Sequence, residues 1–493
     1  MSMAKTQAQQ KLTGITKVPT GIQGLDEILN GGLPCGRSSL VCGNAGCGKT
    51  FLGMQFLVNG AQKYGSPGVF VSFEETSEEL RKNFASIGVD LNDLEKRKLL
   101  ALDYIFIERS EIKETGEFDL EGLFVRLGQA VRSIGAKRIV IDTIEALFSG
   151  FSNEAILRAE LRRLFRWLKS NGLTAIITGE RIGEIFTRHG LEEFVADCVI
   201  LLDNNIVDQI STRRMRIVKY RGSSHGTNEY PFLIGANGMS VLPITSISMD
   251  YKVTAERISS GIEALDRMLE GEGYFRGSSI LVSGSPGSGK TSIASHFLDA
   301  CCRRGEKCLL FTFEESGEQL ARNLESIGLH LKIGVKKGLL KIIAQRPTFQ
   351  GLEFHLLEIH DLVRRFGPQA VVVDPVSCFS CVGKNWQIRS MLSRLVDFFK
   401  SENITALFTD LINGNDPAEE SYISSLADTW ILLNNASGMQ RERSLGIIKS
   451  RGMAHSDEFF PIKIGREGLG LGKARHEGLK KGVVSIETFG AGR

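Results

Sequence analysis

The sequence lacks any apolar run of about 18 residues, the length at which a membrane-spanning helix is suspected. Its first residues, MSMAKTQAQQKL, are polar. It also lacks an excess of one charge, because 60 Lys and Arg against 57 Asp and Glu leave a net charge of +3. A balance this close to neutral gives no field that would attract a nucleic acid or a membrane surface. We therefore expect a cytoplasmic protein that has no membrane partner and does not bind nucleic acid.

The nine cysteines do not form the pattern of a disulfide framework. Cys47 lies within a glycine-rich loop, and Cys301 and Cys302 are adjacent in a predicted helix, where they face different directions. Cys378 and Cys381 have the spacing of a C-x-x-C redox motif. We interpret them instead as two small apolar residues that follow a buried strand.

What the sequence does contain is one nucleotide-binding pattern, written twice. GNAGCGKT ends at Thr50 and GSPGSGKT ends at Thr291, and both fit the phosphate-loop pattern G-x-x-x-x-G-K-[ST]. The flanking segments repeat as well: TGIQGLDEIL returns as SGIEALDRML, and FEETSEELRKNFASIGVDL returns as FEESGEQLARNLESIGLHL. Lys49 and Lys290 are 290 − 49 = 241 residues apart. The chain is therefore predicted to be a tandem ATPase with two repeats of that length.

Each repeat alternates short apolar runs with segments of helical periodicity. In the first repeat a helix is predicted from Thr50, and further strands continue through VFVSFEE and the later apolar runs. This alternation predicts a mostly parallel sheet with helices on both faces, and such sheets bind ligands at the carboxyl ends of their strands. The clearest predicted strands of the first repeat are 38–43, 137–143, 173–181 and 197–205.

The two glycine-rich loops have the chemistry of a phosphate cradle. Glycines let backbone N–H groups approach phosphate oxygens, and the following helix adds a partial positive charge. Lys49 and Lys290 are predicted to contact the β- and γ-phosphates of ATP, and Thr50 and Thr291 to ligate Mg²⁺. The predicted ATP-binding glycines are Gly43, Gly46, Gly48, Gly284, Gly287 and Gly289.

Acidic residues at strand ends supply the remaining catalytic groups. Asp142 and Asp374 each end an apolar strand and are predicted to hold the Mg²⁺, although an aspartate in this place can also cap a helix. A carboxylate facing the γ-phosphate can orient or deprotonate the attacking hydroxyl. The candidates are the pairs Glu74–Glu75 and Glu314–Glu315. Neighbouring strand residues point to opposite faces, so one member of each pair suffices, and the sequence leaves open which.

Basic residues also repeat late in each half. IVKYRGSSH supplies Lys219, Arg221 and His225, and IIKSRGMAH supplies Lys449, Arg451 and His455. We interpret both segments as loops. A solvated hairpin would explain one of them, but the repetition in register favours a role at a nucleotide. Arg158 and Arg389 also recur, and either a neighbouring subunit's nucleotide or the solvent is a reasonable partner for them.

The halves disagree in one informative place. When Asp197 is aligned with Asp428, the upstream segments are LEEFVAD and YISSLAD, so that Ser424 and Ser425 stand where the first half has Glu193 and Phe194. Only the second half therefore offers hydroxyl acceptors for a phosphate. The alternative is that the two serines cap a helix or line a turn.

These motifs together resemble the KaiC family, the duplicated RecA-like ATPases of the cyanobacterial clock and their bacterial relatives. The resemblance rests on both phosphate loops, both FEE motifs, both K-x-R-G segments and ESYISSLADT, and it extends from about Gly14 to Gly465. It implies two tandem RecA-like P-loop domains, each a mostly parallel sheet with helices on both faces. The expected boundaries are a tail over 1–13, domains over 14–245 and 253–465, a linker over 246–252 and a tail over 466–493.

The family's properties can be transferred to matching residues. The resemblance implies a double-ring homohexamer with ATP and Mg²⁺ between subunits, a slow ATPase in the first domain and a serine/threonine autokinase in the second. Ser424 and Ser425 match the family's phosphorylated pair. The glutamate pairs match its catalytic glutamates, and Lys219, Arg221, Lys449 and Arg451 match residues that reach a neighbour's nucleotide. The expected role is a timing or signalling module.

Three departures from the family pattern bear on regulation. Both acceptors are serine here, Glu419 stands where the family has a further threonine, and the chain ends early in SIETFGAGR. In the family that tail is where KaiA docks, so KaiA binding is not expected, and a KaiB-like protein remains the candidate partner. The runner-up functions are a RecA-like recombinase or helicase, which the neutral charge disfavours, and a scaffold that binds ATP only to assemble.

Overall fold

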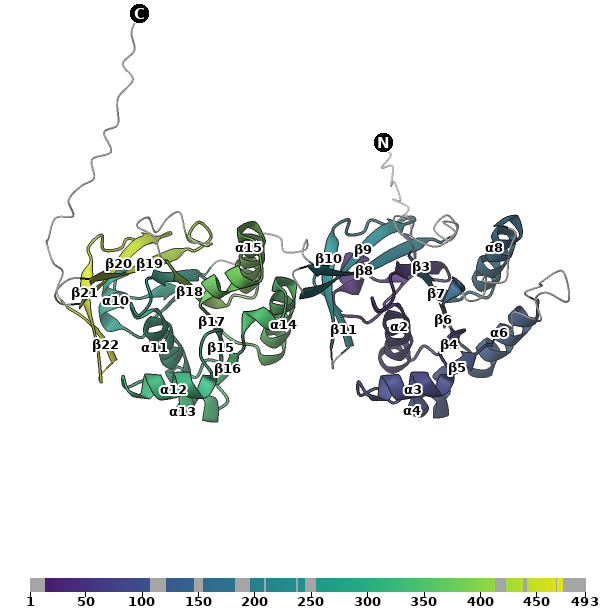
Figure 1. The fold of residues 1–493 in the computed structure, drawn as a ribbon, viewed down its shortest axis with the longest axis horizontal. Coiled ribbons are helices and arrows are strands. Elements are labelled where there is room, and N and C mark those ends of the chain that lie inside the picture. The colour runs from purple at the N-terminus through teal and green to yellow at the C-terminus, as the bar shows by residue number, and fades with distance from the viewer. Residues whose placement is uncertain are drawn as a thin grey trace, which may run out of the picture. The chain divides into compact units, whose positions relative to one another are not determined.

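The computed structural model describes residues 14–106, 121–145, 154–181, 196–207, 210–235, 238–243, 254–412, 423–437, 441–466 and 468–472. The expected N-terminal tail, the linker and most of the expected C-terminal tail lie outside the described residues, as do Glu193, Phe194 and Glu419. The chain divides into two compact units that change over between Ser246 and Ile247, with Glu353–Ile359 counted in the first. Figure 1 labels the elements of both.

The first unit is built on a sheet of nine strands in the order β11-β10-β9-β8-β3-β7-β6-β4-β5. Strands β8, β3, β7, β6, β4 and β5 are parallel, and β9 to β11 add an antiparallel edge. The strands are β3 (Ser38–Gly43), β4 (Gly68–Ser72), β5 (Leu100–Tyr104), β6 (Arg138–Asp142), β7 (Thr174–Glu180), β8 (Cys198–Val207), β9 (Ile210–Tyr220), β10 (Glu229–Gly235) and β11 (Gly238–Val241). The main helices are α2 (Lys49–Tyr64), α3 (Ser77–Ala85), α4 (Leu91–Lys96), α6 (Glu121–Ile134) and α8 (Glu154–Ser170).

The second unit repeats this topology strand for strand, in the order β16-β15-β17-β18-β14-β19-β20-β21-β22. Its strands are β14 (Ser279–Gly284), β15 (Cys308–Thr312), β16 (Leu340–Ala344), β17 (Ala370–Asp374), β18 (Thr405–Leu411), β19 (Thr429–Ser437), β20 (Arg441–Ser450), β21 (Phe460–Gly465) and β22 (Gly468–Leu471). The helices are α11 (Lys290–Arg303), α12 (Gly317–Glu325), α13 (Leu331–Lys336), α14 (Leu352–Phe366) and α15 (Asn385–Ser401), with the 3₁₀ helix η2 (Val376–Cys381) after β17. Smaller elements precede each sheet: β1 (Lys17–Val18), α1 (Leu25–Ile28) and β2 (Leu33–Pro34) in the first, and β12 (Arg257–Ile258), α10 (Glu263–Met268) and β13 (Tyr274–Phe275) in the second.

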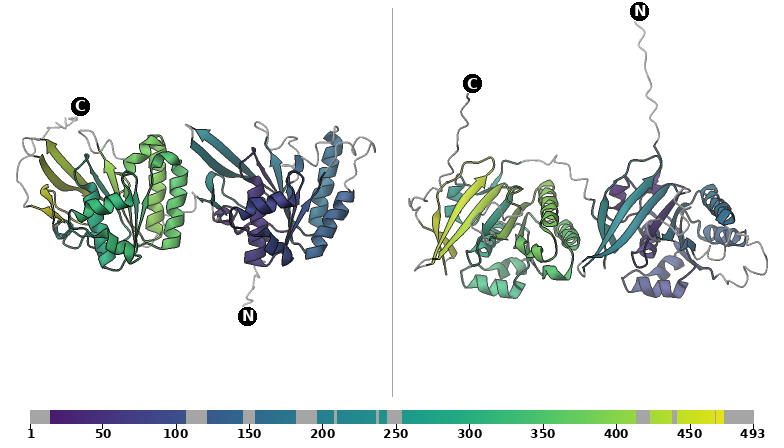
Figure 2. Two further views of the ribbon diagram at one scale, coloured as in Figure 1. Left: turned by 60° about the horizontal axis from the view of Figure 1, so that its bottom comes forward. Right: turned by 45° about the horizontal axis from the view of Figure 1, so that its top comes forward.

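Helices cover both faces of the sheet, as the alternation of elements predicts. Val41 and Phe70 point into a core shared with α2, α3 and α4, whereas their neighbours Leu40 and Val71 point into a core shared with α6 and α8. Because successive strand residues face opposite sides, a parallel strand with a helix layer on each face must be apolar along its whole length. The two layers are seen on either side of the sheet in Figures 1 and 2.

The structure corrects two details of the predicted elements. The strand expected through VFVSFEE ends at Ser72, because the Glu75 N–H donates to the Ser72 Oγ at 3.0 Å and Thr76 then caps α3. The segments IVKYRGSSH and IIKSRGMAH, predicted to be loops, begin as the ends of strands. Lys219 lies in β9 opposite Val199, and Lys449 lies in β20 opposite Trp430, and only Arg221 and Arg451 lie in the turns that follow.

The two cores fill one equivalent corner in different ways. In the first unit the buried Arg138 side chain lies in this corner, with its guanidinium 4.5 Å from the Phe56 ring centre and its Nη1 donating to the Phe56 carbonyl at 3.0 Å. Burial lowers the pKa of Arg138 to about 10. Gly60 makes room for it, since a Cβ there would come within 2.7 Å of the Arg138 side chain.

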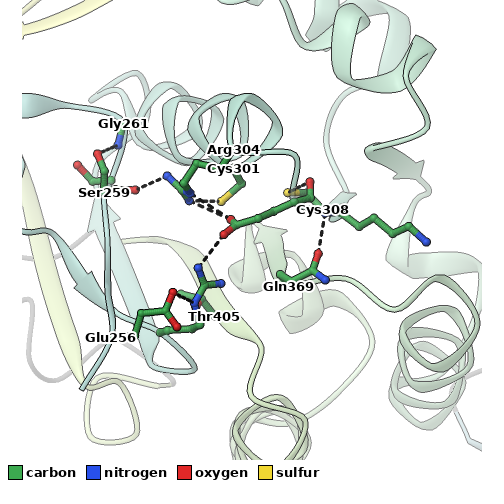
Figure 3. A network of polar contacts seen from close by, with 12 residues as sticks. Glu256, Ser259, Gly261, Cys301, Arg304, Cys308, Gln369 and Thr405 are labelled. Carbon is green, nitrogen blue, oxygen red and sulfur yellow. Dashed lines mark hydrogen bonds and ion pairs between the residues drawn. The ribbon is translucent and has the colours of Figure 1, made fainter. Parts of the chain in front are cut away.

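In the second unit Ala370 stands at the place of Arg138, and the freed space is filled by thiols. Cys301 stands at the place of Gly60 (60 + 241 = 301), and Cys308, the first residue of β15, stands at the place of Gly68 in β4. Both are fully buried in one core cluster with Ala370. Figure 3 shows this corner, where Arg304 donates to the Cys301 Sγ at 3.0 Å and also pairs with Glu306. The first unit thus combines the large Arg138 with Gly60, whereas the second combines the small Ala370 with Cys301 and Cys308.

This exchange predicts that Gly60 and Arg138 are energetically coupled. Arg138→Ala alone should cost about 3 kcal/mol through the cavity that it leaves, and Gly60→Ala alone about 2 kcal/mol through overpacking. Gly60→Ala combined with Arg138→Ala should cost less than the sum by more than about 1 kcal/mol. Urea denaturation of the full chain measures these free energies of unfolding. As a control, Gly60→Ala with the exposed Arg132→Ala should be additive, and additivity in the test pair would contradict the compensation.

Candidate functional site

The two glycine-rich loops have the same structure. Each follows the carboxyl end of the central strand and ends in the long helix α2 or α11. Gly46 and Gly48 have φ of 73° and 105°, and Gly287 and Gly289 have φ of 70° and 111°. Such angles favour glycine, because a side chain would be strained there. The run of backbone N–H groups at a helix start is the arrangement that binds phosphate.

The lysine of each loop is held across it by carbonyl oxygens. The Lys49 Nζ donates to the carbonyls of Gly43 at 2.8 Å and Asn44 at 3.1 Å. The Lys290 Nζ donates to the carbonyls of Gly284 at 2.8 Å and Ser285 at 2.9 Å. Both lysines are at most 8% exposed. The loop therefore fixes one cation at the position where it can meet a phosphate.

A hydroxyl and a carboxylate meet beside each loop. The Thr50 Oγ1 donates to the Asp142 Oδ2 at 2.9 Å, and the Thr291 Oγ1 donates to the Asp374 Oδ2 at the same distance. The second oxygens accept from the hydroxyls of Thr178 and Thr409, partners that the sequence analysis missed. Burial raises the pKa of Asp142 and of Asp374, while the hydroxyl bonds oppose the rise. Both carboxylates are thus directed to hydroxyls rather than to the start of a helix.

These residues fit a divalent cation. A carboxylate that burial has destabilised in its charged form gains from a cation beside it. The described residues contain no group of three or more His, Cys, Asp or Glu side chains that could hold a metal by themselves. Mg²⁺ suits such a place, because it is usually held by one or two protein oxygens together with phosphates and water. Asp142 with Thr50, and Asp374 with Thr291, are the residues that would hold it.

The two members of each glutamate pair diverge. The Glu74 Oε1 accepts from the Thr143 Oγ1 at 2.9 Å, directly beside Asp142. The Glu75 Oε2 instead accepts from Asn83 of α3 at 3.1 Å. The second unit repeats this: Glu314 contacts Cys378, which follows the Asp374 strand, and Glu315 accepts from Asn323 of α12 at 3.3 Å. Of each pair, Glu74 and Glu314 are thus the members that lie beside the end of the strand that carries Asp142 or Asp374, whereas Glu75 and Glu315 contact a helix.

A cavity of about 840 Å³ opens next to Glu314 in the second unit. Arg346 and Arg389 line it together with Trp386 of α15, whose side chain is 67% exposed. Arg389, proposed above to reach a neighbour or the solvent, thus lines the same cavity as Glu314 of its own unit. Arg158 is exposed on α8. No motif or repeat pointed to Arg346, which lies just after β16.

The second group of predicted residues gathers at the other end of the sheet. The Lys449 Nζ donates to the carbonyl of Ser424 at 2.7 Å, and the Arg451 Nη2 donates to the carbonyl of Ser425 at 2.7 Å. Asp428 links this group to α15 through an ion pair of 2.8 Å with Lys400. Ser424 is half-buried and Ser425 is exposed. The candidate acceptors are therefore attached to the two basic residues through their backbone.

The strand register separates these residues from the phosphate loop of their own unit. Thr429 pairs with Ile280 at the start of β14, and Leu433 pairs with Gly284 at its end. The serines precede Thr429, so they lie near the amino end of the sheet, about 20 Å from the loop at a rise of about 3.3 Å per residue. In the first unit, Lys219 and Arg221 lie toward the corresponding end. Val199, near the start of β8, pairs with Lys219 of β9 on one side and with Leu40, near the start of β3, on the other. His225 stacks on Tyr220 there.

Comparison with known proteins identifies the family. The family model described as "ATPase: KaiC" matches twice, over residues 18–246 and 258–475. The chain is 53% identical to the circadian clock protein KaiC2 of Synechocystis sp., over 93% of this chain and 81% of that protein. It is 39% identical to KaiC3 of the same organism, over 94% and 93%, and 38% identical to the circadian clock oscillator protein KaiC of Parathermosynechococcus lividus, over 93% and 86%. The chain belongs to the KaiC family of ATPases, and its two units are tandem KaiC domains of the RecA-like fold.

Within the part of the chain that the structure describes, no helix is both long enough and apolar enough to cross a bilayer.

The diverging glutamates predict unequal effects of substitution. In a chain that carries Glu314→Gln, so that the second domain is slowed, Glu74→Gln should lower the remaining ATP turnover by about 100-fold, the usual size of a general-base contribution. Glu75→Gln, the matched control, should change it less than about threefold, because Glu75 points to Asn83. Phosphate release under saturating ATP measures both. A larger loss in Glu75→Gln than in Glu74→Gln would reverse the assignment.

Proposed function

We propose that this member of the KaiC family is an ATP-dependent homohexamer whose first domain hydrolyses ATP slowly and whose second domain phosphorylates and dephosphorylates Ser424 and Ser425. Its role is that of a timing or signalling module, and a KaiB-like protein is the proposed partner. The first domain extends over about 14–245 and the second over about 253–465. The observation that carries the proposal is the location of the serines at the end of the sheet opposite to their own phosphate loop.

The residues at the carboxyl ends of the strands would form one half of each nucleotide site. Lys49 and Lys290 are the fixed cations that would neutralise the β- and γ-phosphates of ATP. Mg²⁺, when bound, supplies further positive charge to the phosphates. Glu74 and Glu314 would accept the proton of the attacking group, water in the first domain and either water or a serine hydroxyl in the second.

The residues at the amino ends of the strands would form the other half. Lys219 and Lys449 pair at positions level with Leu40 and Leu281, about 10 Å along the strands before the end that carries the phosphate loop. Lys449 and Arg451 are directed away from that loop, to the carbonyls of Ser424 and Ser425. These residues would therefore serve a nucleotide bound elsewhere. A second copy that brings its phosphate loop to this end would complete the site. A closed ring repeats one such heterologous contact between identical subunits, so this geometry supports a ring assembly, and the number of six subunits rests on the resemblance to the family.

The serine acceptors suit transfer between subunits. Lys449 and Arg451 hold the carbonyls of Ser424 and Ser425, so the residues that would meet a neighbour's phosphates also carry the acceptors toward them. An in-line transfer needs the hydroxyl close to the γ-phosphate, with Glu314 of the phosphate-binding subunit near enough to take the proton. The first domain has Glu193 and Phe194 at the matching places and offers no acceptor there.

Transfer between subunits can be tested by mixing two complementary chains. The first chain carries Lys290→Ala and Thr291→Ala, which disable its second phosphate loop but leave the serines. The second carries Ser424→Ala and Ser425→Ala, which remove the acceptors but leave the loop. Mixed as monomers and then given radiolabelled ATP, the first chain should become labelled, although neither chain labels itself alone.

The matched control adds Lys290→Ala to the second chain, and labelling of the first chain should then disappear. Phosphopeptide analysis should locate the label at Ser424 and Ser425. If the wild type labels itself while the mixture stays unlabelled, phosphate is transferred within one chain and the geometry proposed here is wrong.

Assembly is expected to depend on nucleotide in the first domain. Because ATP would be shared between subunits, it stabilises the assembled state by mass action, by about 2.7 kcal/mol at a concentration of 100 times its dissociation constant. Lys49→Ala should therefore leave monomers or small oligomers in light scattering under ATP. Lys290→Ala is the matched control and should still assemble. Hexamers of wild-type stability in Lys49→Ala would refute this dependence.

A further inference from the structure

The two cysteines of the C-x-x-C segment follow the buried strand β17, as the sequence indicated, but they are not themselves fully buried. They belong to the 3₁₀ helix η2, which follows Asp374 after Pro375. Cys378 is half-buried and Cys381 is exposed. Both line the cavity of about 840 Å³ that also contains Glu314. The thiols are therefore accessible to small molecules, next to the proposed base of the second domain.

Cys378 takes over a contact that a threonine makes in the first domain. There, the Thr143 Oγ1 donates to Glu74 at 2.9 Å. Thr143 directly follows Asp142, and in the second domain Pro375 stands at this place and has no hydroxyl. The Cys378 Sγ lies 3.6 Å from the Glu314 Oε1 and donates to it instead. Sulfur is a weak donor, so Glu314 is held less firmly than Glu74.

The protonation of Cys378 suits this donor role. Burial, the negative charge of Glu314 and the hydrogen bond to it raise the pKa of Cys378 to about 12. The thiol therefore keeps its proton at neutral pH and can donate it.

The helix geometry brings the two thiols within reach of each other. In a 3₁₀ helix residues three apart lie on the same side, and a rise of about 2.0 Å per residue places their Cα atoms roughly 6 Å apart. Disulfides span Cα distances of about 4.4 to 6.8 Å. The Cys381 Sγ already turns back along the helix, because it donates to the carbonyl of Cys378 at 2.8 Å. A rotation of side chains is enough to join them.

We propose that Cys378 positions Glu314 in the reduced protein and that Cys378 and Cys381 form a reversible disulfide that slows the second domain. The kinetic part rests on the proposed role of Glu314 as base. The first domain has no counterpart, since the residues four and seven places after Asp142 are Ala146 and Ser149, where Asp374 is followed by Cys378 and Cys381. Oxidation would thus act on the two domains differently.

The oxidation balances with a low-molecular-weight disulfide as oxidant. The exposed Cys381 thiolate attacks oxidised glutathione, forms a mixed disulfide and releases one glutathione thiolate. Cys378 then passes its proton to Glu314 and its sulfur attacks that of Cys381, releasing the second glutathione. Two electrons pass from the protein dithiol to the glutathione disulfide. The new disulfide has no S–H group, so Glu314 loses its hydrogen-bond donor. Glu314 carries the proton taken from Cys378 until that proton is released to solvent.

The first test asks whether the disulfide forms. Full-length protein incubated with oxidised glutathione and digested without reductant should give a peptide that contains Cys378 and Cys381 and is about two mass units lighter, because two hydrogens are lost. Dithiothreitol should reverse this. Cys381→Ser should instead stop at a free or glutathionylated Cys378. If the wild type shows no internal disulfide under these conditions, the proposed site does not exist.

The second test asks whether the disulfide acts on the base. In a chain with Glu74→Gln, which leaves the second domain's turnover to be measured, oxidation should lower kcat about tenfold with little change in KM, and Cys381→Ser should be insensitive. Cys378→Ala should be slow without oxidant, while Cys378→Ser, whose hydroxyl can still donate, should keep most of the activity. A full activity of the disulfide form, or equal loss in Cys378→Ala and Cys378→Ser, would overturn the positioning role.

A further variant separates this inference from the proposed function. Glu314→Gln in the same Glu74→Gln background should remove the second domain's turnover. If that turnover persists, the assignment of Glu314 as base is wrong, and the kinetic part of the inference is overturned with it. The mass measurement still decides the disulfide by itself.

Discussion

The direction of the central strand decides what each domain can do alone. In both domains this strand lies between two parallel neighbours, β7 and β8 around β3, and β18 and β19 around β14. The phosphate loop must leave at its carboxyl end, and the segment that enters β8 or β19 must arrive at its amino end. Because strand polarity cannot be reversed without refolding the sheet, a phosphate and the K-x-R-G residues of one domain stay on opposite sides. Under the proposed function, a complete site would therefore include residues of another subunit.

The duplicated fold leaves the second domain free to differ at a few side chains. The phosphate loop, its lysine and the Thr–Asp contact keep the same bonds to within about 0.2 Å in the two domains. The surrounding groups differ: a buried arginine is exchanged for thiols, a threonine donor for a cysteine donor, and Glu193 and Phe194 for two serines. In the proposed function, these exchanges are what would let one copy hydrolyse ATP while the other modifies itself.

The sequence predicted the parts of the site that depend on local backbone geometry. The phosphate loops, β3 and the start of α2 follow from glycine spacing and apolar runs, so their positions could be read within one or two residues. Asp142 and Asp374 could be located because each ends a buried strand. The mostly parallel sheet with helices on both faces followed from the alternation, the RecA-like assignment followed from the family resemblance, and the family comparison confirms both.

The parts that could not be predicted depend on contacts across the sheet. Thr178 and Thr409 lie inside apolar strands, and only the pairing of neighbouring strands brings them to the aspartates. The divergence of Glu74 from Glu75 depends on Asn83, whose helix starts at a cap that the sequence analysis did not use. Lys219 was assigned to a loop because its segment mixes basic and apolar residues, yet pairing with β8 makes it a strand residue. The cavity beside Glu314 needs α15 and η2 together, and periodicity carries no information about that.

The central claim is that each candidate acceptor serine is served by the nucleotide of another subunit. An electron cryo-microscopy map of the ATP-bound assembly measures this directly, as the identity of the chain whose γ-phosphate lies nearest to Ser424 and Ser425. The strand polarity predicts that this phosphate is bound by the phosphate loop of the adjacent chain, with Lys449 and Arg451 beside it. A nearest γ-phosphate on the loop of the same chain would contradict the claim.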